Sequence, residues 1–79
     1  MAHHPIKFDF SRLRGRIIEK YGSCAAFAES LGRSAVWLSN RLNNVVHWHS
    51  DEIAEVCKPE RLDIPPEEIP PYFYTPKFR

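Results

Sequence analysis

The sequence predicts an all-α domain of four or five short helices, and three observations lead to this fold class. Apolar residues recur at helical spacing along the chain, and potential helix caps alternate with glycines or prolines at helix-length intervals. The β-prone run 45–49 is too short and isolated to build a sheet. The length of 79 residues leaves room for one small domain.

The first predicted helix follows Asp9 and ends at Tyr21. Its apolar residues fall at i, i+3, i+7, i+8 and i+11, which places them along one stripe: Phe10, Leu13, Ile17, Ile18 and Tyr21. Asp9 is the expected N-cap, and Gly22 can adopt the left-handed conformation that ends a helix.

Two shorter helices are predicted next, over 24–31 and 35–43. Ser23 and Ser34 are the expected N-caps, and Gly32 ends the first of the two. The first is about two turns long, so it depends on packing for its stability. Leu38 and Leu42, one turn apart, form the inner face of the second.

The remaining chain is predicted as a loop, two helices and a tail. Trp48 anchors the loop 45–49, and the helix that opens with Ser50-Asp51-Glu52 ends at Pro59. A short helix over 65–69 is ended by Pro70-Pro71. The proline-rich tail, 71–79, carries four aromatics in nine residues, so it either covers the chain's own core or docks on a second copy or another protein.

Composition narrows the possible functions. The chain is 43% hydrophobic and 27% charged, as in ordinary globular proteins, and it lacks both a membrane-length apolar run and a signal peptide, so we expect a cytoplasmic protein. Cys24 and Cys57 are expected to be small buried hydrophobes. His47 and His49 could share one side of an extended segment, but further metal ligands are missing.

No enzymatic motif is visible in the sequence. It has no glycine-rich phosphate loop, no nucleophile elbow and no pair of carboxylates on one apolar face. We therefore expect no catalytic residues, no cofactor and no metal.

Charge is divided unevenly along the chain, although the net charge is only +1. Residues 1–43 carry seven basic and three acidic side chains, and residues 44–79 carry four basic and seven acidic ones. Either this asymmetry is a chance fluctuation, or it marks an anion-facing surface at one end and a partner-facing surface at the other.

The two helices around Gly32 have the features that a helix-turn-helix requires. Ala28 is small at the expected point of closest approach, and Gly32 permits a sharp turn. The segments Phe27-Ala28-Glu29-Ser30-Leu31-Gly32 and Leu38-Ser39-Asn40-Arg41-Leu42-Asn43 resemble the Cro and phage-repressor class of helix-turn-helix proteins. The run from Lys7 to Gly22, together with Ile64-Pro65-Pro66-Glu67-Glu68-Ile69 and Thr75-Pro76-Lys77, is similar to a family of small Cro-like phage and prophage proteins of unknown function.

The resemblance implies a lambda-repressor-like domain over 7–70, between a disordered start, 1–6, and the aromatic tail, 71–79. It also implies that one face of the third helix enters the DNA major groove and contacts bases through Ser34, Ala35, Val36, Ser39, Asn40 and Asn43. The expected phosphate contacts are Ser23, Cys24, Ala25, Arg33, Trp37 and Arg41. Trp37 could instead pack into the core, and the sequence after Asn43-Asn44 lacks the glycine usual in this class.

From these features we expect a Cro-type transcriptional repressor, acting as a homodimer on a pseudo-palindromic double-stranded DNA operator at the nucleoid of a bacterial host. The alternative is a protein-binding modulator, or antirepressor, that captures another phage repressor through the aromatic tail or the third helix. The small net charge and the acidic second half favour this alternative. The Ser39, Asn40 and Arg41 surface favours DNA.

Overall fold

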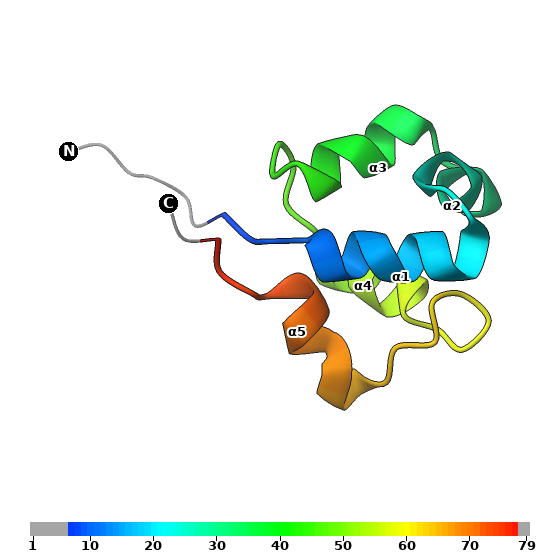
Figure 1. Cartoon of the computed structure of the whole chain (residues 1–79). Coiled ribbons are helices and arrows are strands. Elements are labelled where there is room, and N and C mark those ends of the chain that lie inside the picture. The colour runs from blue at the N-terminus through cyan, green and yellow to red at the C-terminus, as the bar shows by residue number, and fades with distance from the viewer. Residues whose placement is uncertain (1–6, 78–79) are drawn as a thin grey trace.

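The computed structural model describes residues 7–77 and shows the all-α fold expected from the sequence (Figure 1). The expected disordered start, 1–6, and the last two residues of the tail, 78–79, lie outside the described residues. Within 7–77 there is no strand and there are five α-helices: α1 (Ser11–Tyr21), α2 (Cys24–Ser30), α3 (Ala35–Leu42), α4 (Ser50–Val56) and α5 (Ile69–Phe73). The short 3-10 helix η1 (Pro66–Glu68) precedes α5.

Local side-chain bonds stand at the start of α1, α2 and α3. The hydroxyls of Ser23 and Ser34 accept the amide protons of Ala26 and Trp37, as expected for the N-caps of α2 and α3. Asp9 lies one residue before the N-cap position of α1, where its carboxylate accepts the Ser11 amide proton over 2.9 Å. Each bond satisfies a backbone donor that the helix itself leaves free.

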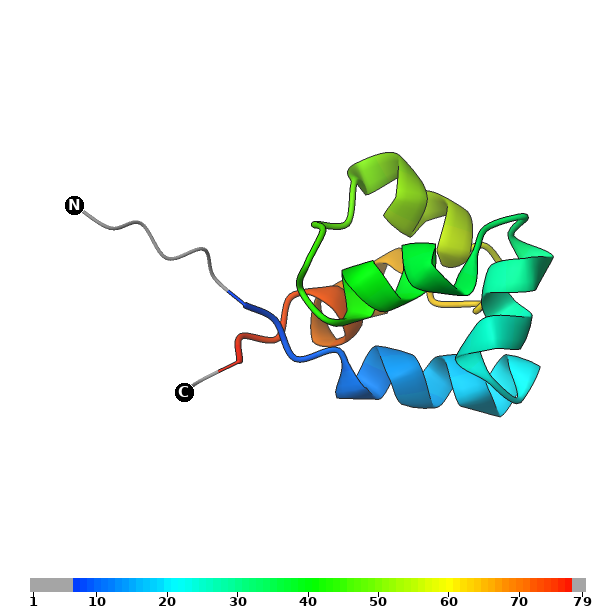
Figure 2. The same ribbon diagram turned by 90° about the horizontal axis from the view of Figure 1, so that it is seen from above.

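The helices surround one hydrophobic core. α3 lies above α1 and α4 (Figure 1) and crosses over the space between them when seen from above (Figure 2). α2 packs against both α1 and α3, and α1 packs against α5. The buried apolar residues come from every α-helix and from segments outside the helices: Phe10, Leu13, Ile17, Phe27, Ala28, Leu38, Leu42, Ile53, Val56, Cys57, Leu62, Ile64 and Phe73. Cys57 is buried as expected, and Cys24 is only half-buried.

The C-terminal segment differs from the sequence expectation. Pro70 and Pro71 do not end the short helix after Ile69, because they lie in the first turn of α5. A first-turn residue needs no intrahelical acceptor for its amide, so proline fits there. The helix therefore continues across residue 70, and Phe73, 2% exposed, packs in the chain's own core.

The two ends of the described chain lie side by side. Phe8 and Pro76 form an isolated antiparallel bridge, flanked by hydrogen bonds from Asp9 N to Thr75 O and from Lys77 N to Lys7 O, both 2.8 Å. No helix within 7–77 has the length and apolar character needed to cross a bilayer.

Candidate interaction surface

The residues that were expected to contact DNA bases lie on the outer face of α3 and at its two ends. Among the six residues expected to contact bases, Ser34, Ala35, Val36, Ser39 and Asn43 are exposed, and Asn40 is half-buried. The sharp turn before α3 is made possible by Gly32, whose φ is +72°. Val36 lies in the first turn of α3 and is 66% exposed.

One further residue extends this face. Val45 follows α3 and is 68% exposed, and its amide donates to the Asn40 carbonyl over 2.8 Å. This bond holds the residue against the end of α3. Sequence reasoning missed Val45 because it read 45–49 only as a loop, although an apolar residue beside a turn was a usable signal. We define the α3 surface as Ser34, Ala35, Val36, Ser39, Asn40, Asn43 and Val45.

The α3 surface carries no ionisable side chain. Polar groups on it partly satisfy one another, since Asn43 Nδ2 donates to Ser39 Oγ over 3.1 Å. Affinity for DNA comes largely from cations placed against phosphates. The surface is therefore chemically closer to a protein contact, with two exposed valines and several uncharged polar groups.

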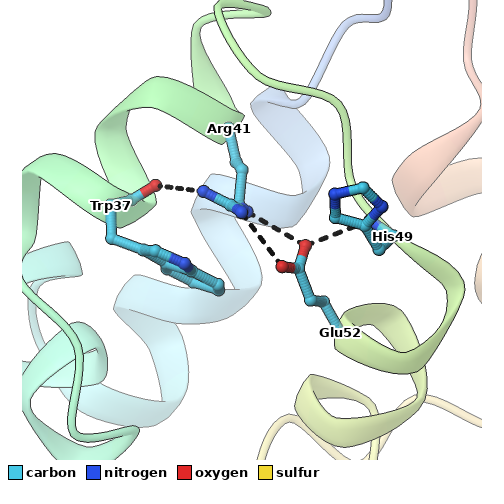
Figure 3. A network of polar contacts seen from close by, with 4 residues as sticks. All are labelled: Trp37, Arg41, His49 and Glu52. Atoms are coloured by element: carbon cyan, nitrogen blue, oxygen red, sulfur yellow. Dashed lines mark hydrogen bonds and ion pairs between the residues drawn. The ribbon is translucent and has the colours of Figure 1, made fainter.

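Arg41, expected to contact phosphate, is instead buried inside the molecule (Figure 3). Its Nε and Nη2 donate to the two carboxylate oxygens of Glu52 over 3.0 and 2.9 Å, and its Nη1 donates to the Trp37 carbonyl over 3.2 Å. With 8% of the residue exposed and the guanidinium held on a carboxylate, Arg41 does not have its donors available for a phosphate.

Glu52 is the centre of this polar network. Besides Arg41, it accepts the backbone amide proton of His49 over 3.0 Å, at the start of α4. The hydrogen bonds from Arg41 hold the pKa of the Glu52 carboxyl below its ordinary value near 4.5, despite desolvation, which acts in the opposite direction. The carboxylate thus stays charged and neutralises Arg41.

Trp37, also expected at a phosphate, is half-buried beside this pair. The Arg41 guanidinium lies 4.0 Å from the centre of its ring, and Arg33 lies 4.8 Å from it. The edge of Trp48 meets Trp37 at a centroid distance of 5.9 Å. These contacts agree with the alternative that Trp37 packs against the core. Arg33 itself is exposed, next to Ser34 at one end of the α3 surface.

The other expected phosphate contacts lie at the start of α2. Ser23 and Ala25 are exposed and Cys24 is half-buried, while the Ser23 hydroxyl is used to cap the helix. None of these three carries a positive charge, so the cations that DNA binding would need are not gathered here.

His47 and His49 do not form part of a metal-ligating group of three or more side chains in the described chain.

The fold and this surface define a class: a small all-helical domain that exposes an uncharged helix face containing two exposed valines. Residues 6–76 match the family described as "Protein of unknown function (DUF739)", and the chain belongs to this family. No curated protein matches the sequence.

A solved structure is also similar to this chain. It is the solution structure of the modulator of repression (MOR) of the temperate bacteriophage TP901-1 from Lactococcus lactis, with a TM-score of 0.74 and 39% sequence identity. The match covers 85% of this chain and 88% of that chain. The phage link of the predicted resemblance is thereby supported.

The main functional expectation, a Cro-type DNA-binding repressor, is wrong. The similar phage protein is a modulator of repression, which favours the protein-binding alternative over a repressor. The expected DNA operator and homodimer likewise find no support in this comparison. Sequence reasoning erred because a polar third helix with an arginine is typical of DNA readers, and the neutralisation of Arg41 by Glu52 cannot be seen in the sequence.

Proposed function

We propose that this chain modulates repression in a phage or prophage by binding a repressor protein through the α3 surface. The observation that carries the proposal is the absence of any charged side chain from the α3 surface, together with the exposure of Val36 and Val45 at 66% and 68%. The activity is binding alone, with no catalytic step.

The chemistry of the α3 surface suits a protein partner. Fully burying a valine contributes on the order of 1.5 kcal/mol, so the two valines together can anchor a contact of moderate affinity. The serines and asparagines around them can form uncharged hydrogen bonds at the rim. The similarity to a phage modulator of repression supports a phage repressor as that partner.

The test uses the purified chain and the repressor encoded in the same phage or prophage genome, with binding measured by isothermal titration calorimetry. Val36→Glu should weaken the complex at least tenfold, because it places an unpaired charge in an apolar contact. Ile18→Glu is the matched control, since Ile18 is an exposed apolar residue, 49% accessible, on α1 outside the α3 surface.

The salt dependence of the dissociation constant distinguishes an uncharged contact from an electrostatic one. Because the α3 surface is uncharged, the dissociation constant should change less than about threefold between about 50 and 300 mM NaCl. No binding to the repressor would contradict the proposed function. Loss of binding in Ile18→Glu with full binding in Val36→Glu would remove the α3 surface from it.

A further inference from the structure

An apolar groove lies away from the α3 surface, where the end of α4, the loop after it and residues 66–69 come together. Figure 1 shows this loop and α5 below α1, whereas α3 lies above it. The volume of the groove is about 470 Å³, within the range of about 300–1,000 Å³ that is typical of ligand pockets. Its apolar lining includes Ala54, Pro59, Ile64, Pro65, Pro66 and Ile69. The groove therefore has room for more than one apolar side chain of a ligand.

The walls of this groove are fixed by the fold. Arg16 of α1 donates from Nε to Leu62 O over 2.9 Å and from Nη2 to Asp63 O over 3.1 Å. The Ile64 amide donates to the Cys57 carbonyl over 3.1 Å. The prolines of the lining have a φ that is set by their rings. A groove that is already formed loses little conformational freedom when a ligand binds.

The uncompensated charge around the groove is negative. Asp63 belongs to the lining, and Glu67 and Glu68 lie in η1, between two residues of the lining. All three residues are exposed, and none of them takes part in a salt bridge within 7–77. The basic residue of the lining, Lys58, is paired with Glu55, whose carboxylate lies 3.0 Å from its ammonium. The groove therefore combines apolar walls with an anionic border.

From this combination we infer that the groove binds a basic amphipathic segment of another protein. The segment places apolar side chains in the groove and directs lysines or arginines toward Asp63, Glu67 and Glu68. Lysine and arginine suit this role because their apolar stems cover apolar surface while their charged ends reach the carboxylates. Amphipathic helices commonly bind in apolar grooves through residues at i, i+3, i+4 and i+7. The inference is independent of the repressor and of the α3 surface.

The test uses a synthetic peptide of about 14 residues, with leucines at i, i+3, i+4 and i+7 and lysines at the other positions. Its matched control has glutamate in place of every lysine. Binding to the purified full chain is measured by fluorescence anisotropy of the labelled peptides at about 150 mM NaCl, where charges more than about 8 Å apart are largely screened. The lysine peptide should bind with a dissociation constant below about 100 µM, and the glutamate peptide at least about tenfold more weakly.

Two alanines on helices test the apolar part of the site. Ala54→Lys places a long side chain in the groove and repels the lysines of the peptide, so it should weaken binding at least about tenfold. Ala25→Lys makes the same change at an exposed alanine of α2 outside the groove, and it should weaken binding less than about twofold.

Two carboxylates test the charged border. Asp63→Asn removes one negative charge, and asparagine tolerates the φ of +54° at this position, so binding should weaken about threefold without a change of fold. Glu29→Gln removes the same charge from an exposed residue of α2, and its effect should stay below about 1.5-fold.

Amide resonances of the 15N-labelled chain locate the bound peptide, and those of Ile64 and Ile69 should shift more than those of Val36 and Val45. Several results would overturn the inference. These are the absence of saturable binding by the lysine peptide, equal binding of the glutamate peptide, an equal loss in the two alanine variants, or larger shifts at Val36 and Val45 than at the groove.

Discussion

The guanidinium of Arg41 has three hydrogen bonds and an aromatic ring beneath it, and this environment determines what the residue does. The side chains of Arg41 and Glu52 are 10% and 14% exposed, so each charge depends on the other for stabilisation. A buried ion pair contributes little compared with well-packed apolar residues, but removal of one member leaves a buried charge.

Arg41→Ala should therefore reduce the free energy of unfolding by about 3 kcal/mol, because Glu52 remains buried without its partner. Arg33→Ala is the control, since Arg33 contacts the same Trp37 ring but is exposed, and it should cost less than about 1 kcal/mol. Urea unfolding measures both values. Equal losses would mean that ring contact, not the ion pair, stabilises this region.

The lowered pKa of Glu52 predicts a pH dependence of stability. The hydrogen bonds from Arg41 favour the charged carboxylate, so their contribution is complete above the ordinary value near pH 4.5 and is lost as the pH falls through the lowered folded-state pKa. Glu52→Gln should flatten the loss of unfolding free energy between about pH 5 and pH 2. Glu55→Gln should flatten it less, because that carboxylate is 44% exposed in its pairs with Lys58 and Arg61. Parallel curves for Glu52→Gln and the natural sequence would contradict this account.

At the scale of elements, Asn44 connects the end of α3 to the paired chain ends. Its φ of +64° is in the left-handed region, a conformation that glycine adopts most readily and asparagine tolerates. Its side chain bonds both the N and the O of Phe8, as a neighbouring strand would. These bonds occupy the backbone groups of Phe8 that an additional strand would need. Pro76, on the other side of the pairing, has no amide proton to donate to an additional strand. Both outer edges of the Phe8–Pro76 pairing are therefore protected against the addition of strands.

Asn44→Ala should lower the free energy of unfolding by about 2–3 kcal/mol, because it loses two hydrogen bonds and strains the positive φ. Asn44→Gly should cost about 1–2 kcal/mol, since glycine tolerates this φ but also lacks the side-chain bonds. Asn43→Ala serves as the exposed control and should cost less than about 1 kcal/mol. Denaturant unfolding gives the order, and a glycine variant less stable than the alanine variant would contradict the role assigned to φ.

At the scale of the whole molecule, the described part of the tail closes the core. Phe73 is 2% exposed and contacts Trp48, which in turn contacts Trp37 on α3. Tyr74, its neighbour, is 51% exposed and packs edge-on against Phe8. The aromatic chain from α5 to α3 makes the C-terminal segment a part of the fold.

Phe73→Ala should cost about 3–5 kcal/mol, a large share of the stability of a chain this small. Tyr74→Ala should cost about 1 kcal/mol or less. Removal of residues 72–79 should therefore abolish cooperative thermal unfolding followed by circular dichroism. A truncated chain that still melts cooperatively would show that the core is complete without Phe73.

Much of the architecture could be predicted from local sequence. The caps Ser23 and Ser34, the stop at Gly22 and the inner face of α3 with Leu38 and Leu42 all depend on residues within one or two helical turns of each other. Such signals are local, because a cap or a helical face is completed by neighbours in the chain. The outer-face residues of α3 were instead implied by the resemblance to the Cro and phage-repressor class.

The sequence by itself thus determined the fold class, most helix starts and the inner face of α3, whereas the outer-face residues of α3 were implied by the resemblance and Val45 was missed. Only the tertiary structure decided what that surface carries, because Arg41 is neutralised by Glu52, eleven residues further along. It also decided that Pro70-Pro71 begin α5 and that Phe73 enters the core, since both depend on contacts with distant segments. The charge of a surface and the burial of an aromatic are set by pairs far apart in the chain, and no local pattern encodes which distant partner is present.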